Sequence, residues 1–399
     1  MNEPNKLKVL AVVDYYLPGY KGGGPAVSVS RLIDCLQSDL SFYVFTRDRD
    51  LGDKRPYQEI QSDAWTQKSG MQLFYASPKN LNIVGLWKTI RDSKPDVIYL
   101  NSYFSKLTRS VLVLRSLGLV RKTPILIAPR GEFSKGALQL KSFKKKQYLA
   151  LANLSRFHSG ITWQVSSVHE LSDAKAVVST NADYFIKAPD IVDRSSTTLS
   201  PVRPKKQSGV AEFAFISRIS PKKNLLGAIE MLRSIRGNVT FAIYGPIEDQ
   251  AYWDQCELAI ASLPKNIQCV VKGGIPNDQV LHKLSEHHFF LFPTLGENFG
   301  HVIPEALAAG CPVLLSDQTP WLDFDEKGVG WVLSLNDLDG WKDTVQKCVD
   351  MSSQELDSMS KAATSYLAAM AQSSTDVDLN RSLFSSTIEN HLSHVALTN

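Results

Sequence analysis

The sequence predicts an α/β protein with two doubly wound domains in series. On either side of about residue 200, short apolar runs alternate with longer amphipathic runs. This alternation is typical of a parallel sheet covered on both faces by helices. A chain of 399 residues is also long for one hydrophobic core and comfortable for two.

The first half alternates in this way up to a segment of different composition. The run LSPVRPKKQSG at Leu199–Gly209 has prolines, basic residues and serines but no periodic apolar pattern, so we interpret it as an interdomain linker. Before it we expect a helix at Ala26–Leu36 and strands at Leu7–Val13, Phe42–Thr46, Val97–Leu100 and Ile125–Ala128.

The alternation restarts after the linker. Expected strands are Glu212–Ser217, Thr240–Tyr244, Ile267–Lys272, Phe289–Pro293 and Val313–Ser316, and expected helices are Asn224–Ile235, Gln250–Ser262 and Gln279–Glu286. The tail after about Met351 has helical character. We therefore expect domains at 1–200 and 201–375, with a C-terminal helix at 376–399 for which packing back on the first domain is one option.

Composition narrows the functional classes. A chain that is 43% hydrophobic and 21% charged is typical of a soluble globular protein. No apolar run reaches the roughly 18 residues of a membrane span, and the N-terminus resembles no signal peptide. The five cysteines are scattered, which favours neither disulfides nor zinc and suggests the cytoplasm. A net charge of +4 does not indicate nucleic-acid binding.

The most informative segment is FLFPTLGENFGHVIPEALAAGCPVLLS, which starts at Phe290. A glycine-containing loop follows a strand and leads into a helix expected to start near Pro304 and to end at Gly310. Loop amides and a helix N-terminus suit a diphosphate. Glu305 could accept hydrogen bonds from ribose hydroxyls and Glu297 from a sugar hydroxyl. The alternatives are a favourable helix macrodipole for Glu305 and simple solvation for Glu297.

The segment FAFISRISPKKNL supplies cations at the end of a strand. Arg218 and Lys223 flank the turn into the next helix and can clamp a diphosphate, with Lys222 expected as their exposed neighbour. The alternative is a solvated basic helix start, although cations are unfavourable there without an anion. In the first half, the glycines Gly22, Gly23 and Gly24 allow a close approach to a ligand, or form a flexible turn.

Taken together, these motifs resemble the retaining glycosyltransferases of the two-domain GT-B fold. Glu297 and Glu305 have the E-x7-E spacing, Arg218 and Lys223 are similar to the Arg/Lys pair, and the glycine loop is similar to the N-terminal glycine loop of glycosyltransferase family 4 (glycosyl transferases group 1). The resemblance covers nearly the whole chain. It implies two Rossmann-like domains that face each other across a cleft, with the acceptor in the first and the nucleotide sugar in the second.

The resemblance also implies roles for single residues. Glu305 would bind the ribose, Glu297 the donor sugar, and Arg218 and Lys223 the diphosphate. Further donor-binding positions would be Asn298, Phe299, Gly300, Gly23, Gly24 and Gly245, with the base near Gly273, Gly274 and Ile275. His169 and Glu170 resemble a further family segment at the cleft, although such a pair is more often structural.

One departure from the family pattern bears on mechanism. Arg130, in APRGEF, replaces the histidine of many members, and as a catalytic residue it could hydrogen-bond a donor sugar or phosphate. Arginine stays protonated and is a poor base, which fits a retaining reaction in which the leaving phosphate deprotonates the acceptor. Asp48 and Asp50 have DxD spacing but lie in an expected loop, so we expect a metal-independent reaction and no cofactor besides a UDP-sugar or GDP-sugar substrate.

A basic cluster suggests a second partner. Lys135, Lys141, Lys144, Lys145 and Lys146 crowd into an expected amphipathic helix, which suits either contact with an anionic membrane or an ordinary solvated face. The sequence thus predicts sugar transfer to a glycan or lipid-linked acceptor, in bacterial surface polysaccharide assembly on the cytoplasmic side. The alternatives are a GT-B fold NDP-sugar epimerase and a non-catalytic nucleotide-sugar-binding protein.

Overall fold

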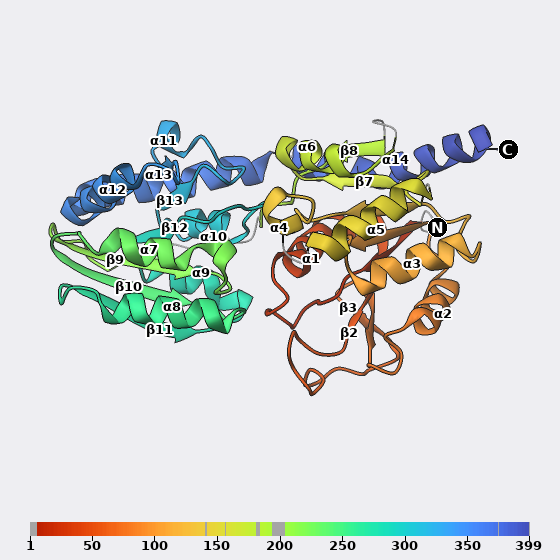
Figure 1. The fold of residues 1–399 in the computed structure, drawn as a ribbon. Helices are drawn as coiled ribbons and strands as arrows, with labels where there is room; N and C mark the ends of the chain where they lie inside the picture. The colour runs from red at the N-terminus through yellow and green to blue at the C-terminus, as the bar shows by residue number, and fades with distance from the viewer. Residues whose placement is uncertain are drawn as a thin grey trace. The chain divides into compact units, whose positions relative to one another are not determined.

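The computed structural model describes residues 6–139, 142–155, 157–180, 184–193, 204–373 and 375–398. The chain forms two compact units, drawn in Figure 1. Unit 1 takes the described residues up to Ile191 and those after 374, and unit 2 runs from Val192 to Ser373. The chain therefore enters unit 1, crosses to unit 2 and returns to unit 1 at its C-terminal end.

Unit 1 is built on a mixed sheet with the order β3-β4-β2-β1-β5-β6-β7-β8. All neighbouring pairs are parallel except β3 and β4, which form an antiparallel pair at one edge. The strands are β1 (Leu7–Val12), β2 (Leu40–Arg47), β3 (Trp65–Lys68), β4 (Met71–Ala76), β5 (Val97–Asn101), β6 (Ile125–Ala128), β7 (Thr162–Val165) and β8 (Phe185–Lys187).

Helices cover both faces of the unit 1 sheet. Side chains alternate along a strand, so Val9 and Ala11 of β1 join one buried cluster while Leu10 and Val12 join another. The helices are α1 (Gly24–Leu36), α2 (Ile83–Ser93), α3 (Lys106–Ser116), α4 (Lys135–Gln139), α5 (Ser142–Leu154), α6 (Val168–Val177) and α14 (Thr375–Thr398). Of these, α14 contacts α1, β5, β6 and β7.

Unit 2 is built on a parallel sheet with the order β11-β10-β9-β12-β13-β14. Its strands are β9 (Val210–Ile216), β10 (Asn238–Tyr244), β11 (Ile267–Gly273), β12 (Phe289–Phe292), β13 (Val313–Ser316) and β14 (Gly330–Leu333). Its helices are α7 (Leu225–Leu232), α8 (Gln250–Ala261), α9 (Asn277–Ser285), α10 (Val302–Ala308), α11 (Phe324–Lys327), α12 (Leu338–Asp350) and α13 (Ser353–Gln372).

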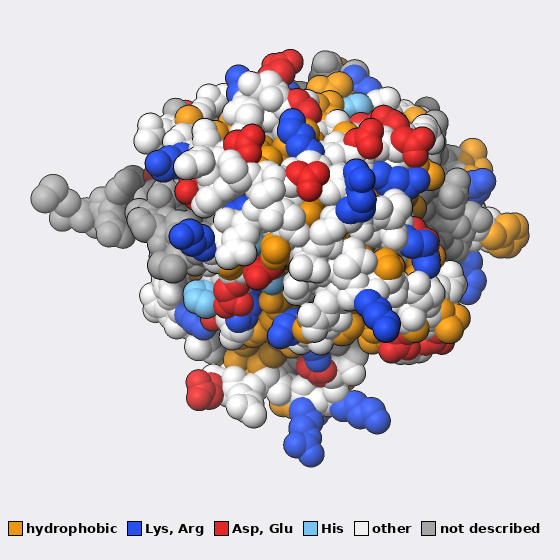
Figure 2. Space-filling model, turned by 90° about the vertical axis from the view of Figure 1, so that its left-hand side faces the viewer, with side chains coloured by type: hydrophobic (Ala, Val, Ile, Leu, Met, Phe, Trp, Pro, Cys, Tyr) orange, Lys and Arg blue, Asp and Glu red, His pale blue; other side chains and the backbone are white. Residues whose placement is uncertain are grey.

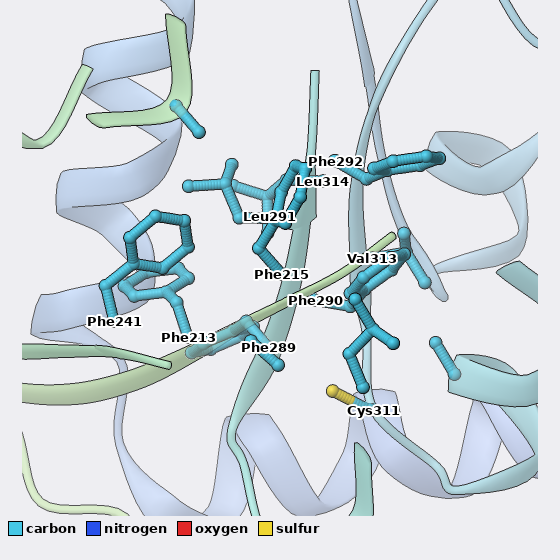
Figure 3. Packing of buried hydrophobic residues seen from close by; sticks show 14 of the residues in the cluster. Phe213, Phe215, Phe241, Phe289, Phe290, Leu291, Phe292, Cys311, Val313 and Leu314 are labelled. Carbon is cyan, nitrogen blue, oxygen red and sulfur yellow. The ribbon is translucent and has the colours of Figure 1, made fainter. Parts of the chain in front are cut away.

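The unit 2 core is rich in phenylalanine. Three neighbouring strands supply the buried rings that Figure 3 shows at close range, namely Phe213, Phe215, Phe241, Phe289, Phe290 and Phe292. The ring centroids of Phe215 and Phe292 lie 5.9 Å apart in an edge-on arrangement that is favourable for aromatic pairs. This packing fixes β9 beside β12, and the site described below depends on that neighbourhood.

The expected linker is only partly described. Its residues 199–203 lie outside the described residues. Lys206 is buried, and its ammonium donates to the carbonyls of Gln207, Val349 and Met351 at 2.9, 2.8 and 2.9 Å. Burial lowers the pKa of this lysine. The chain is therefore anchored to the C-terminal end of α12 before β9 begins.

The surface carries mixed charge. On the face drawn in Figure 2, acidic and basic side chains are interspersed, with no large area of a single sign. Among the described residues, no helix is both long and apolar enough to cross a membrane.

Candidate functional site

The candidate site of unit 2 lies where β9 and β12 end side by side. The loops that follow the two strands are joined by hydrogen bonds to backbone carbonyls. Leu295 donates its N–H to the carbonyl of Lys222 at 2.9 Å, and the hydroxyl of Thr294 donates to the same carbonyl at 3.1 Å. Asn224 donates from its side chain to the carbonyl of Pro293 at 2.8 Å. Parallel sheets bind ligands at this edge.

Lys223 and Glu297, which come from the two separate motifs, form an ion pair in this place. Their side chains are only 13% and 10% exposed. Thr294 also donates its hydroxyl to Glu297, at 3.2 Å, and the Lys223 ammonium lies 5.6 Å from the centre of the Phe292 ring. The structure thus joins a predicted diphosphate contact and a predicted sugar contact in one buried pair.

Arg218 lies at the same edge but has another partner. Its guanidinium donates to Glu248 at 2.8 Å, and both side chains are partly exposed. Glu248 follows β10 and is held by its own N–H, which donates to the carbonyl of Ile219 at 3.1 Å. The loops after β9, β10 and β12 therefore contribute two carboxylates to the basic cluster.

The prediction that Lys222 is an exposed neighbour is wrong. Lys222 is half-buried in the 3-10 turn Pro221–Lys223. Burial lowers the pKa of Lys222, Glu297 opposes that shift, and Lys223 and Arg218 add to it. Two consecutive lysines in a tight turn after a strand end are the signal that sequence reasoning passed over, because a tight turn can direct both side chains to the same edge.

The loop before α10 is fixed from behind. Trp321 donates its indole N–H to the carbonyl of Phe299 at 2.6 Å, and the two rings pack 5.2 Å apart. Gly300 has φ 79°, and a Cβ there would approach Ile303 to 2.7 Å. Glycine is therefore required at this position. The backbone at Phe299 is thus held by Trp321 from behind.

The helix that carries Glu305 starts slightly earlier than predicted. α10 begins at Val302 rather than Pro304, and Gly310 follows its C-terminal cap with φ 60° as expected. Glu305 remains in the first turn and is half-buried. It lies in the same loop-and-helix segment as Glu297, which belongs to the loop before α10.

Two glycines lie side by side at the C-terminal ends of β10 and β11. Gly245 donates its N–H to the carbonyl of Gly273 at 2.8 Å. A Cβ on Gly245 would lie 1.8 Å from the carbonyl oxygen of Ser217, so this position admits only glycine. Gly274 is exposed beside them. These positions shape the backbone at the strand ends, which accounts for the glycines whether or not a ligand binds there.

In unit 1, the glycine loop precedes α1. Gly23 has φ 81° and caps the helix without a side chain. Gly24 is the first residue of α1 and is exposed, whereas a Cβ on Gly22 would collide with the ring of Tyr15. The loop is ordered by Asp50, whose carboxylate accepts hydrogen bonds from the backbone of Tyr20 and Lys21 at 2.8 and 3.1 Å.

The two aspartates with DxD spacing serve internal contacts. Asp48 and Asp50 are 2% and 5% exposed. Asp48 accepts from Arg49 at 2.7 Å and from the Ser62 hydroxyl at 3.0 Å. Among the described residues, no group of three or more His, Cys, Asp or Glu side chains is arranged to hold a metal ion.

Arg130 lies in a buried polar network of unit 1. Its guanidinium donates to Asp190 at 2.5 Å, to the Tyr99 hydroxyl at 2.6 Å and to Asn101 at 2.8 and 3.1 Å. Its φ of 57° is unusual for a residue other than glycine. These described contacts direct the Arg130 side chain into the interior of unit 1. They suit a residue that positions the loop after β6.

His169 and Glu170 separate in the structure. His169 is exposed at the start of α6. Glu170 is buried, and its carboxylate accepts from the N–H of Gly131 at 2.6 Å and from the N–H and hydroxyl of Ser166 at 2.7 and 2.8 Å. Glu170 thus braces the loop that carries Arg130, as expected of a structural carboxylate.

The comparisons with known proteins agree with this architecture. Residues 198–366 match the family described as glycosyl transferases group 1. A comparison with curated proteins gives no match. Structures with similar folds include the Anabaena protein HepE, in complex with UDP and glucose, at 15% identity and a TM-score of 0.68, with coverage of 94% of this chain and 98% of that one.

Two further solved structures are similar over nearly their whole length. One is sucrose-phosphate synthase from Thermosynechococcus elongatus, with 15% identity, a TM-score of 0.68 and coverage of 95% of this chain and 100% of that one. The other is WaaG, a glycosyltransferase involved in lipopolysaccharide biosynthesis, with 14% identity, a TM-score of 0.63 and coverage of 94% and 98%. The predicted α/β fold, with the two sheets of GT-B glycosyltransferases, is confirmed.

Proposed function

We propose that this protein is a retaining glycosyltransferase that moves a sugar from a UDP-sugar or GDP-sugar to an acceptor hydroxyl. The observation that carries the proposal is the pairing of Lys223 with Glu297 at the C-terminal edge of the unit 2 sheet. Residues 74 apart in the sequence meet there, inside the segment that matches the glycosyl transferases group 1 family. In the proposed site, Lys223 would act as a cation for a phosphate, and Glu297 beside it would accept from a sugar hydroxyl.

The proposed reaction needs little covalent chemistry from the protein. The bond between the anomeric carbon and the diphosphate oxygen breaks, and a bond to the acceptor oxygen forms on the same face of the sugar. The acceptor proton passes to the leaving phosphate, so no basic side chain is required. Arg218 and Lys223 would stabilise the negative charge that develops on the diphosphate, without a metal ion.

Roles for the remaining residues follow from their position. Glu305 would hold the ribose hydroxyls, and the backbone at Asn298, Phe299 and Gly300 would contact sugar and phosphate. Gly245 and Gly274 would border the nucleotide. In unit 1, Gly23 and Gly24 would approach the donor, and His169 would support acceptor binding. Arg130, expected from the sequence to contact a donor sugar or phosphate, would instead position the loop after β6, and Glu170 would hold that loop. These assignments rest on the family resemblance and on the strand-end positions described above.

A ligand screen tests the donor. Thermal unfolding should shift upward with UDP or GDP and not with ADP, because a ligand that binds only the folded state stabilises it. Stabilisation by none of the three nucleotides would refute the proposal.

An assay of nucleotide release then separates three functions. A transferase releases nucleotide much faster with an acceptor than without it. An epimerase converts the sugar nucleotide without release, and a binding protein does neither. A glycan or lipid-linked glycan hydroxyl is the acceptor class to supply.

We further propose that the protein works on the cytoplasmic face of a bacterial membrane in surface polysaccharide assembly. Support comes from α5, where Lys144 and Lys146 are exposed together with Phe143, Leu151 and Leu154, whose side chains are 72%, 70% and 85% exposed. Basic and apolar side chains on one helix suit an anionic lipid surface.

Lys145 contributes less to this surface than Lys144 and Lys146 do. Lys145 is turned inward, donates to the carbonyl of Ala137 at 2.7 Å and lies 4.9 Å from the centre of the Phe104 ring, which corrects its expected place on the basic face. Lys141 and the side chain of Lys135 lie outside the described residues.

Cosedimentation with lipid vesicles tests the membrane contact. Binding to phosphatidylglycerol vesicles should exceed binding to phosphatidylcholine vesicles and should fall in a Lys144→Gln, Lys146→Gln variant. Lys265→Gln, which removes an exposed lysine of unit 2, is the matched control. Equal binding to both vesicle types would favour an ordinary solvated basic face.

A further inference from the structure

Among the described residues, Lys222 differs from the other two cations of the site in having no counterion. Arg218 is paired with Glu248, and Lys223 is paired with Glu297. Across the described residues, the Lys222 ammonium makes neither an ion pair nor a hydrogen bond. Of the three cations Arg218, Lys222 and Lys223, only Lys222 therefore lacks a carboxylate partner among the described residues.

The position of Lys222 is fixed by its backbone. The Lys222 carbonyl accepts hydrogen bonds from Leu295 and Thr294, which tie its turn to the loop after β12. Its Cε lies 3.8 Å from the point where a Cβ on Gly296 would stand. The lysine stem therefore lies beside this loop at van der Waals distance, near the strand-end edge.

The surroundings of Lys222 favour an anion that the protein itself does not supply. The charged groups that act on its ammonium are Glu297, Lys223, Arg218 and Glu248. Both carboxylates already have a closer cation, and two of the four groups repel the ammonium. A half-buried charge of this kind gains more from a phosphate than a fully solvated lysine does, because its own hydration is already reduced.

We propose that Lys222 is the residue that receives a phosphate of the bound nucleoside diphosphate, while Arg218 and Lys223 keep their carboxylate partners until the ligand arrives. The inference rests on the proposed function, since the nucleotide is the expected source of the phosphate. Pyrophosphate offers the same chemistry without a base, and it distinguishes an anion site from a nucleotide site.

Titration calorimetry with UDP, GDP and pyrophosphate tests this inference. Lys222→Met should weaken binding by roughly tenfold or more, the loss expected for one charge-assisted hydrogen bond. The matched control is Lys265→Met, which removes an exposed lysine before the N-terminal end of β11 and should bind as the wild type does.

A proton measurement gives a readout that a structural role would not move. A phosphate raises the pKa of the lysine beside it, so at about pH 9 the wild type should take up protons on binding. Titrations in two buffers of different ionisation enthalpy measure this uptake. Lys222→Arg should retain most of the affinity but lose the uptake, because arginine stays protonated.

The outcomes distinguish a failure of the Lys222 role from a failure of the proposed function. Wild-type nucleotide affinity in Lys222→Met, or unchanged proton uptake in Lys222→Arg, overturns the role of Lys222 and leaves the proposed function standing. Binding of pyrophosphate that depends on Lys222, without any binding of UDP or GDP, supports the anion site and overturns the proposed function. A wild-type protein that binds none of the three overturns both.

Discussion

At the scale of single residues, the site is a set of charges that partly neutralise one another. Glu297 pairs with Lys223 and Glu248 pairs with Arg218. An incoming diphosphate must therefore compete with two carboxylates for its cations. Glu297 has a proposed second partner, a donor hydroxyl, whereas Glu248 has none, so the two carboxylates should respond differently to substitution.

Replacement of Glu248 by glutamine should tighten nucleotide binding. The change removes the negative partner of Arg218 and leaves a neutral group of the same shape, so UDP or GDP meets a more positive site. We expect affinity to rise by a few-fold at low salt and the gain to shrink as salt screens the charges. Calorimetry at two ionic strengths checks this, and weaker binding in the variant would contradict it.

Replacement of Glu305 by alanine should abolish most of the transferase activity while the fold persists. The first turn of α10 would lose its proposed ribose contact, but Ile303 and Ala306 still pack in the core. Nucleotide release in the presence of acceptor measures activity, and circular dichroism with thermal unfolding measures the fold. Wild-type turnover would remove the ribose role from Glu305.

At the scale of elements, the sequence was most informative where apolar runs were continuous. The strands expected in unit 2, and the four expected in the first half, are present within a residue or two. The pair β3 and β4, the strands β7 and β8, and the edge strand β14 were not predicted. Gln72 and Phe74 of β4 are half-buried, and Trp65 is the one partly buried residue of β3, so their patterns are weak.

The site was predictable as residue types but not as contacts. The motifs indicated Lys223 and Glu297 separately, because each follows a strand. That β9 and β12 are neighbours is a property of sheet order, which a single sequence does not state. The inward position of Lys222 depends on a turn three residues long, and the network around Arg130 depends on side chains from three separate segments.

A buried histidine of unit 1 makes stability depend on pH. His158 is 1% exposed, and its ring Nε2 is hydrogen-bonded to the Tyr103 hydroxyl at 2.6 Å. Burial lowers the pKa of His158 from 6.5 to about 4. Above about pH 6.5 both folded and unfolded states are neutral. Between 6.5 and 4 only the unfolded state takes the proton, so stability falls by about 1.4 kcal/mol per pH unit.

The measurement is the unfolding midpoint between about pH 7 and pH 5. The loss on acidification should be smaller in His158→Gln than in the wild type, whatever the variant's stability at neutral pH. His282→Gln changes an exposed histidine of α9 and should keep the wild-type slope. Equal slopes in all three proteins would contradict the assignment to His158.

At the scale of the whole molecule, each unit has its own sheet and its own buried clusters. Nucleotide contacts are proposed chiefly on unit 2, whereas the acceptor is assigned to unit 1. The nucleotide and the acceptor should therefore slow amide exchange in different units.

Hydrogen exchange can distinguish the two binding regions. With UDP or GDP alone, amide exchange should slow most in the loops after β9 and β12, at residues 217–224 and 293–301, because ligand contacts there suppress local opening. Residues 117–124 of unit 1, which connect α3 to β6 and have no proposed ligand contact, serve as an internal reference. Protection confined to unit 1 would contradict the assignment of the nucleotide to unit 2.

The return of the chain to unit 1 has a consequence for biosynthesis. Phe384 of α14 packs against Phe42 and Tyr99, so the last helix completes a core begun by the first strands. A ribosome releases Phe42 and Tyr99 well before it releases Phe384. Unit 2 has all its described strands and helices before α14 emerges, whereas unit 1 keeps part of an apolar sheet face uncovered until α14 is made. Premature termination before Thr375 would therefore yield a folded unit 2 joined to an aggregation-prone unit 1.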